Sequence, residues 1–328
     1  MYGMRKMGKL YFIINPNAKN GYSLKVWAKV EKELKRQQIP YEAFLTAYKG
    51  NGAEIALILA KQEGEVSIAV VGGDGTVNEI INGVISFPHV KVGLVPAGSG
   101  NDFARGFHIP RNPLHALSVL LRERKQEPSL TDVGKISSDS KEDLYFINNM
   151  GAGLDGLISK LANQSKMKKW LNKFSLGGLV YVYLLIKEIL FYQPTDVQLT
   201  VDGIAHDFPA TWFVTVANQP FYGGGMQIAP NAKTDDGLLN IIIVHRLSRL
   251  KMLSVFVSVF WGGHVAFKEV KMLTGREIQI YSSTPMMAHA DGDYFAETPL
   301  QIQACQQVLP IITRGIKKDR GQKELKNA

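Results

Sequence analysis

The first 100 residues alternate between short apolar runs and stretches in which apolar residues recur every three or four positions. The runs are typical of buried strands and predict strands at Leu10–Ile14, Tyr41–Leu45, Val66–Val71 and Val90–Val95. The periodic stretches between them predict helices at Leu24–Leu34, Ala53–Lys61 and Val77–Val84. Strands separated by helices of this length form parallel βαβ units, so this part is predicted to be a doubly wound α/β domain.

After about residue 130 the strand-like runs follow one another directly. They predict antiparallel strands at Leu144–Asn148, Val197–Val201, Trp212–Ala217, Leu238–Val244, Glu277–Tyr281 and Leu300–Ala304. Turn dipeptides such as Asp202-Gly203, Asp236-Gly237 and Asp291-Gly292 lie at several junctions. Helical excursions are expected at Leu157–Tyr192 and Leu247–Trp261. We therefore predict an α/β domain over residues 1–130, a mainly β domain over 131–306 and a C-terminal segment over 307–328.

Composition and charge narrow the class of protein. The chain has 328 residues, which suggests two domains at ~100–200 residues each. Its single cysteine, Cys305, excludes an internal disulfide framework and a Cys-based zinc site, and the seven histidines have no metal-ligand spacing. The 38 Lys and Arg residues against 29 Asp and Glu give a net charge of +9, which favours anionic partners.

Part of this charge gathers in two segments. Lys160–Lys173 holds five lysines and no acid, and the tail Arg314–Ala328 holds six basic and two acidic residues. Both segments are either solvated surface or attracted to anionic lipid. Nucleic acid is not expected as a partner, because the basic residues cluster beside apolar helices and no known binding motif appears.

The sequence predicts neither a secretory signal nor a membrane span. The longest apolar window, Phe174–Tyr192, is interrupted by Lys187 and Glu188, whereas a span needs ~20 apolar residues. The window is therefore expected to be a buried or interfacial helix. We expect a cytoplasmic protein that meets the inner membrane face as a peripheral protein.

Polar and glycine-rich residues follow each predicted parallel strand. Asn15-Pro16, Thr46, Gly72–Thr76 and Gly98–Asp102 come directly after the four strands. The carboxyl ends of parallel strands share one edge of a sheet, where ligands collect. The sequence therefore predicts a nucleotide site at this edge.

The loop Gly72–Thr76 combines glycines with an acid and a hydroxyl. Its glycines allow a ligand to approach the backbone, and the N–H groups of a following helix attract phosphate. Asp74 is placed to reach a metal ion or a reacting hydroxyl. Thr76 is expected to cap the helix, with Glu79 three residues later completing a capping box.

The segment Val70–Glu79 resembles the nucleotide-binding motif shared by diacylglycerol kinases, sphingosine kinases and NAD kinases. The next loop, Pro96–Arg105, resembles the lipid-kinase branch, and the second Gly-Thr-rich motif of an NAD kinase is missing. The resemblance spans roughly residues 9–312 and is closest to the soluble bacterial diacylglycerol kinase-like proteins. It implies an α/β nucleotide domain, a β-sandwich domain with the active site between them, and a return of Val308–Ile312 to the first domain.

The resemblance also implies roles for single residues. The candidate ATP-binding residues are Asn15, Pro16, Thr46, Gly72, Gly73, Asp74, Gly75, Thr76, Asn78, Glu79, Gly98, Ser99 and Asn101. Asp74 is expected to make the catalytic metal–phosphate contact, since phosphoryl transfer relies on Mg²⁺. A second Mg²⁺ is implied at the backbone carbonyls of Lys233 and Leu238 and the carboxylate of Asp236.

Asp293 is the candidate general base. Relatives usually have Glu at the matching position, which takes the proton of the lipid hydroxyl, and this chain has a carboxylate shorter by one methylene. The difference implies a shifted backbone, a different substrate or a weak activity. The alternative is that Asp291–Asp293 is only a hairpin turn.

The sequence thus predicts a kinase that uses ATP and Mg²⁺ to phosphorylate a lipid hydroxyl, with diacylglycerol giving phosphatidic acid as the leading reaction. Three alternatives stay open: a kinase for a sphingoid base or monoacylglycerol, a small-molecule kinase like NAD kinase, and a nucleotide- or lipid-binding regulator with little catalysis. The expected partners are the lipid substrate and a membrane surface, and a homodimer is also open.

Overall fold

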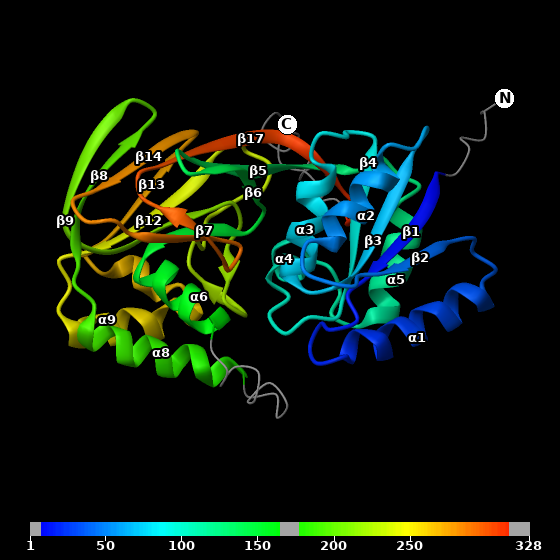
Figure 1. Ribbon diagram of the computed structural model, residues 1–328, viewed down its shortest axis with the longest axis horizontal. Coiled ribbons are helices and arrows are strands. Elements are labelled where there is room, and N and C mark those ends of the chain that lie inside the picture. The colour runs from blue at the N-terminus through cyan, green and yellow to red at the C-terminus, as the bar shows by residue number, and fades with distance from the viewer. Residues whose placement is uncertain (1–7, 165–176, 315–328) are drawn as a thin grey trace, which may run out of the picture.

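The computed structural model describes residues 8–164 and 177–314 (Figure 1). Two halves lie side by side, and two long strands along one edge connect them. The basic tail beyond Arg314 and most of the lysine-rich stretch lie outside the described residues.

The N-terminal half is built on four parallel strands in the order β2-β1-β3-β4. The strands are β1 (Lys9–Ile14), β2 (Glu42–Leu45), β3 (Val66–Gly72) and β4 (Val90–Pro96). The helices are α1 (Tyr22–Arg36), α2 (Asn51–Ala60), α3 (Asp74–Val84), α4 (Asp102–Gly106) and α5 (Pro113–Glu123). The predicted strands and the three predicted helices are all present, and each boundary lies within three residues of its predicted position.

Helices cover both faces of this sheet because both faces are apolar. Alternate residues of β1 enter different cores: Tyr11 and Ile13 pack with α2 and α3, while Phe12 and Ile14 pack with α1 and α5. All four side chains are almost fully buried. Successive side chains of a strand point to opposite faces of the sheet. A parallel sheet between two helix layers therefore requires apolar residues on both faces. The prediction of a doubly wound α/β domain is confirmed.

The C-terminal half is mainly antiparallel. Its strands are β5 (Ser129–Ser138), β6 (Lys141–Phe146), β7 (Asn149–Gly153), β8 (Thr195–Val201), β9 (Ile204–Ala217), β10 (Phe221–Tyr222), β11 (Met226–Gln227), β12 (Leu239–His245), β13 (Val270–Gly275), β14 (Glu277–Ser282), β15 (Met287–Ala290), β16 (Asp293–Glu297) and β17 (Leu300–Ile311). The long strand β9 pairs with β8 through its first part and with β7 and β12 through its second. One apolar core lies inside these strands, so the predicted β-sandwich is confirmed.

In the described part of the chain, three helices and two 3₁₀ turns pack on an outer face of the β-domain. They are α6 (Leu154–Gln164), α8 (Gly177–Phe191), α9 (Arg249–Ser258), η1 (Val259–Trp261) and η2 (Gly263–Ala266). Their buried residues form a second core against β9 and β12. Within the described ranges, every helix is too short or too polar to cross a membrane.

β17 joins the two halves into one continuous sheet. Its first part pairs with β14 and β5, and its end pairs in parallel with β4, where Ile311 lies opposite Val92. The Ile312 N–H donates to the Val92 carbonyl at 2.8 Å. The chain thus returns to the N-terminal half, and its backbone hydrogen bonds restrict how far the two halves move apart.

Candidate active site

The loops after β3 and β4 touch each other through their backbones. The Ala97 N–H donates to the Gly72 carbonyl at 2.8 Å, and a Cβ added at Gly98 would lie 2.4 Å from the Gly73 Cα. The Asn101 side chain, on a residue with φ of 53°, accepts from the Gly98 N–H and donates to its carbonyl. Glycine at both loops therefore permits a contact that any side chain would break.

The other predicted nucleotide-binding residues gather at the same sheet edge. The Asn15 amide donates to the Thr76 hydroxyl at 3.0 Å, and the Thr46 N–H donates to the Ile14 carbonyl next to Asn15 at 2.9 Å. Pro16 is half-buried in the turn after β1, and Ser99 is exposed. The structure thus brings the four strand ends together, as the parallel pattern predicts.

The predicted capping box is wrong. Helix α3 begins at Asp74, so Thr76 lies inside its first turn and its N–H bonds to the Gly73 carbonyl at 3.0 Å. The Thr76 hydroxyl is occupied by Asn15, and Glu79 lies against Gly52 of α2. No side chain in the described ranges caps α3, and its N-terminal end faces the glycine loops.

Two carboxylates converge beside these loops. A Cβ added at Gly100 would lie 3.1 Å from Asp74 Oδ2 and 3.4 Å from Asp102 Oδ2. The Phe103 N–H donates to Asp74 Oδ1 at 2.8 Å, and the Gly224 N–H donates to Asp102 Oδ2 at 2.7 Å. Asp102 also pairs with Arg105, whose guanidinium lies 5.5 Å from the centre of the Phe221 ring.

Burial, together with the nearby charge of Asp74, raises the pKa of Asp102 to about 6. Asp102 was not among the residues that sequence reasoning selected, although it lies within the Asn101-Asp102-Phe103 string that carries the resemblance. Only the fold shows that its carboxylate and that of Asp74 share one site.

Asp291 connects the two halves of the molecule. The Asn78 amide of α3 donates to Asp291 Oδ2 at 2.8 Å and to the Tyr145 carbonyl at 2.9 Å. Asp291 also accepts from three consecutive backbone N–H groups, those of Ile147, Asn148 and Asn149, at 2.9–3.0 Å. Asn78, predicted to contact the nucleotide or cap the helix, therefore binds the β-domain, and the turn Asp291–Asp293 lies beside α3.

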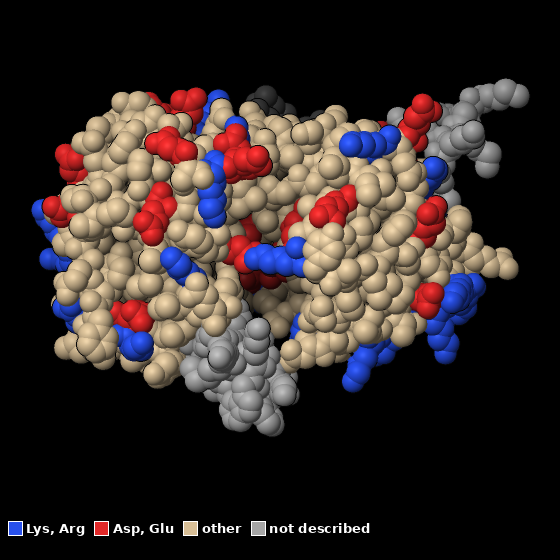
Figure 2. Space-filling model, in the orientation of Figure 1, with Lys and Arg blue, Asp and Glu red and all other residues tan. Residues whose placement is uncertain are grey.

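Asp293 reaches across from the β-domain to the α/β domain. Its Oδ1 lies 2.8 Å from the Lys49 ammonium nitrogen, with side-chain exposures of 45% and 73%. Figure 2 shows a hollow between the halves, with acidic side chains inside it and a basic side chain lying across it. Nothing in the sequence indicates Lys49 as a site residue, apart from its position three residues after Thr46.

His289 of β15 is buried and hydrogen-bonds to the same turn. Its Nδ1 accepts from the Gly292 N–H at 3.2 Å, and its Nε2 lies 3.2 Å from Asp155 Oδ2. Burial opposes protonation of the imidazole, but the carboxylates of Asp155, Asp291 and Asp293 together outweigh it, so the pKa of His289 is raised.

The predicted second metal site lies in a loop beside β5 and β17, the strands that connect the two halves. Asp236 is exposed, and its Oδ1 accepts from the Leu238 N–H at 3.1 Å, while Lys233 is exposed nearby in sequence. Asp132, which sequence reasoning missed, accepts from the Gly237 and Gln307 N–H groups at 2.6 and 2.8 Å, and its pKa is raised by burial.

No cluster of three or more His, Cys, Asp or Glu in the described part of the chain is arranged to hold a metal ion. The predicted set depends on one carboxylate with backbone carbonyls and water, which Mg²⁺ accepts. The second metal site therefore stays a prediction.

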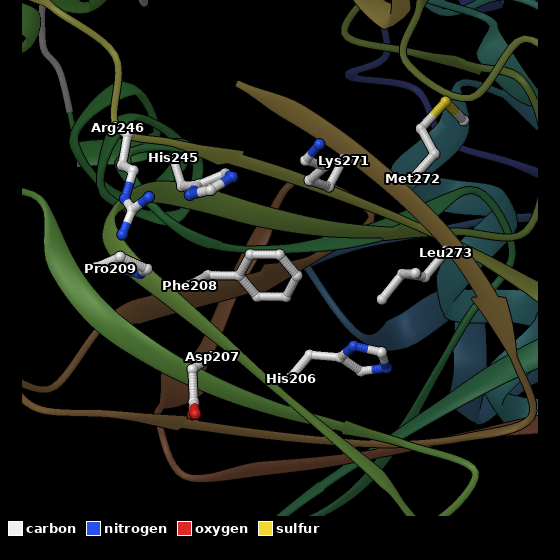
Figure 3. Close-up of a pocket in the computed structure, with 9 residues that line it drawn as sticks. All are labelled: His206, Asp207, Phe208, Pro209, His245, Arg246, Lys271, Met272 and Leu273. Atoms are coloured by element: carbon white, nitrogen blue, oxygen red, sulfur yellow. The ribbon is translucent and has the colours of Figure 1, made fainter. Parts of the chain in front are cut away.

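A separate pocket lies at the end of the β-domain (Figure 3). It has a volume of about 380 Å³, and its lining residues come from β9, β12 and β13 and the turn after β12. None of the predicted site residues lines it. The predicted catalytic and nucleotide-binding residues lie around the hollow between the two halves and not at this pocket.

Comparison with known families agrees with this arrangement. Residues 9–135 match the model of the diacylglycerol kinase catalytic domain, and residues 148–313 match that of the YegS C-terminal NAD kinase beta sandwich-like domain. The chain belongs to the diacylglycerol kinase-like lipid kinases. The enzyme is therefore a phosphotransferase that uses a nucleotide as its phosphoryl donor.

Similar proteins match this lipid kinase over nearly its whole length. YtlR of Bacillus subtilis, provisionally named a lipid kinase, is 30% identical over 318 residues, which cover 94% of this chain and all of that protein. The diacylglycerol kinase of Mycobacterium tuberculosis is 27% identical over 308 residues, covering 94% and 96%. A structure from Bacillus anthracis, titled a diacylglycerol kinase, superposes with a TM-score of 0.70 at 22% identity, covering 95% and 99%, and shows the fold alone.

The contact between the glycine loops can be tested by stability. Gly98→Ala places a Cβ against backbone that has no room to move, so we expect a loss of ~1–3 kcal/mol in the free energy of unfolding. Gly75→Ala is the matched control, because a Cβ there meets nothing within 4 Å and alanine favours helix by up to ~1 kcal/mol. Urea unfolding of both variants measures the difference, and equal stabilities would contradict the contact.

The titration of Asp102 tests the acidic pair. Without added metal, we expect carboxyl NMR to report a pKa of about 6, and Asp74→Asn to lower it while leaving it above the ordinary 3.8, because burial remains. The folded chain holds this proton more tightly than the unfolded chain. The contribution of Asp102 to stability therefore falls between pH 3.8 and about 6 and is constant above that range. An unchanged pKa in Asp74→Asn would show that the two carboxylates do not interact.

Proposed function

We propose that this lipid kinase transfers the γ-phosphoryl group of MgATP to the hydroxyl of diacylglycerol and produces phosphatidic acid. The observation that carries the proposal is that two glycine loops and two carboxylates of the α/β domain share one site, while Asp293 of the opposite domain reaches Lys49 of the α/β domain. The names of the curated relatives support diacylglycerol as the acceptor.

The phosphates of ATP would lie over Gly72–Thr76 and Gly98–Asn101. The uncapped N-terminal end of α3 favours negative charge there, since its first N–H groups and the helix dipole point toward the loops. Asn15 and Thr46 border the same edge and are suited to hold the rest of the nucleotide.

The carboxylates of Asp74 and Asp102 suit a magnesium ion. Their Oδ2 atoms converge on Gly100, and oxygen ligands of this kind, completed by water and phosphate, are those that Mg²⁺ takes. Bound there, the ion would neutralise charge on the transferring phosphoryl group. A second ion at Lys233, Asp236 and Leu238 remains part of the proposal, with Asp132 fixing that loop through Gly237.

Asp293 would act as the general base. It takes the proton of the lipid hydroxyl as the oxygen forms a bond to the γ-phosphorus, and the bond from that phosphorus to the bridging oxygen breaks to release ADP. Lys49 pairs with this carboxylate and supplies positive charge on the donor side of the cleft. The hydrogen bonds of Asp291 hold the turn against α3, which allows the shorter Asp to reach the hydroxyl.

The lipid acceptor places the enzyme at a membrane. We propose a cytoplasmic protein that works at the inner membrane face, with the acceptor hydroxyl entering the hollow between the domains. Another hydroxylated lipid, such as a sphingoid base or monoacylglycerol, presents the same group to Asp293 and is the alternative acceptor.

An acceptor panel tests this function. Pure protein is incubated with ATP labelled at the γ-phosphorus, Mg²⁺, and either diacylglycerol, monoacylglycerol, a sphingoid base or NAD. A labelled organic-soluble product from diacylglycerol is expected. A labelled water-soluble nucleotide would indicate an NAD kinase instead, and ATP binding without transfer would indicate a regulator.

The charge of Asp74 is expected to be essential. Asp74→Asn keeps an oxygen that accepts from the Phe103 N–H but removes the charge, so we expect it to fold normally and to lose on the order of 10²–10³-fold in kcat. Asp74→Ala also removes the acceptor, and it should abolish turnover. Near-normal activity of Asp74→Asn at saturating Mg²⁺ would refute the metal role.

Three variants distinguish a general base at Asp293 from an ordinary exposed acid. Asp293→Asn should lower kcat by ~10²–10⁴-fold, whereas Asp293→Glu should retain or raise it, because both acids accept a proton. Asp139→Asn, an exposed position in the β5–β6 turn, serves as the control and should leave kcat unchanged. If Asp293→Asn is as active as this control, Asp293 is not the base.

A further inference from the structure

Two neighbouring elements of the β-domain are apolar on both their buried and their exposed sides. On α8 the exposed apolar residues are Tyr183, Ile186, Leu190 and Phe191, at 49–70% exposure. On α9 and η1 they are Leu250, Leu253, Val257, Phe260 and Trp261, at 37–80% exposure. Spacings of three, four and seven residues place each set in one stripe.

The opposite sides of these elements already complete the core. Leu184, Leu185 and Ile189 of α8 are buried, as are Met252 and Val255 of α9. Packing therefore does not explain the exposed stripes. Apolar side chains on the exposed side of a helix as well as on its buried side indicate a second apolar contact.

The two stripes form one surface, which we call the α8–α9 face. The helices pack on each other, and the Arg249 side chain at the start of α9 donates to the carbonyls of Leu190 and Tyr192 at the end of α8. In Figure 1, α8 and α9 lie together along the lower edge of the β-domain.

The exposed charges that border the α8–α9 face are positive. Arg249 is exposed, and the side chains of Lys187 and Lys251 are 52% and 53% exposed. The acids Glu188 and Glu269 are only 14% and 10% exposed, and each is paired with one of these lysines. An apolar surface with a basic border complements an anionic bilayer, whereas a second copy would bring like charges together.

The face is also connected to the cleft. Helix α8 packs on α6, and α6 packs on β15 and β16, which flank the Asp291–Asp293 turn. At the end of α6, the Asn163 amide donates to the Gly292 carbonyl at 2.8 Å. A bilayer under the α8–α9 face would therefore lie next to the wall of the hollow that holds Asp293.

We propose that the α8–α9 face docks the enzyme on an anionic lipid bilayer. The apolar stripes enter the interface between headgroups and acyl chains, and the basic border binds the headgroups. The proposal rests on the proposed function for the identity of the reacting lipid, but docking itself requires no catalysis.

Flotation with vesicles tests the docking. Full-length protein is mixed with extruded vesicles of phosphatidylcholine and phosphatidylglycerol at 7:3, or of phosphatidylcholine alone, without ATP. We expect the wild type to bind the anionic vesicles, and added salt to weaken this binding. The double variant Leu250→Glu/Trp261→Glu, which we call the face variant, should lose about tenfold or more in partition coefficient. The control Ile58→Glu/Ile204→Glu, at positions of 67% and 65% exposure outside the face, should bind like the wild type.

Two results would overturn the proposal. One is a partition coefficient of the face variant within twofold of the wild-type value, when thermal unfolding curves show that both proteins are folded. The other is a wild-type dimer in solution that becomes a monomer in the face variant while vesicle binding is unchanged, which would assign the face to a second copy.

A kinase assay separates docking from the proposed function. The face variant should lose activity on diacylglycerol embedded in vesicles and keep it on short-chain diacylglycerol dispersed as monomers. If the wild type binds vesicles through this face but phosphorylates neither acceptor, the proposed reaction fails and the docking stands. Equal loss on both acceptors would contradict docking as the cause.

Discussion

The carboxylate of Asp291 accepts hydrogen bonds from both halves of the molecule, and the geometry of the cleft depends on it. Three backbone N–H groups of the β-domain hold it in place, and the Asn78 amide of α3 binds it from the other side. Helix α3 begins at Asp74, one turn before Asn78. The same helix therefore follows the glycine loop at its start and positions the turn that contains Asp293. The pairing of β17 with β4 limits the remaining freedom between the halves.

Charge within the cleft is divided between the domains. Asp74 and Asp102 concentrate negative charge beside two backbone loops, and burial makes this unfavourable enough to raise the pKa of Asp102. Such a site favours a cation together with the anionic phosphates. On the opposite domain, the carboxylate of Asp293, which is proposed to accept a proton, is paired with Lys49.

Local sequence pattern predicts the elements of the α/β domain better than those of the β-domain. Strands and helices of the α/β domain follow from local pattern, because the apolar runs and the helical periods are long. The same reasoning missed the short elements α4, β7, β10, β11, β13, β15 and β16, which have at most six residues each, and β7 is rich in small residues such as Gly151 and Gly153. It also missed the longer α5 and β5, of 11 and 10 residues. Boundaries failed where a loop residue entered a helix, as at Asp74, and this shift removed the capping box.

The sequence alone predicted the alternation of strands and helices in the α/β domain, the glycine loops at one sheet edge and the likeness to lipid kinases. These properties depend on residue type and on near neighbours in the chain. The tertiary structure decided that Asp102 joins Asp74, that Asn78 binds Asp291 and that Lys49 meets Asp293, a partner 244 positions away. It also left one side of α8 and α9 uncovered. Such pairings come from how distant segments pack, and local periodicity carries no information about them.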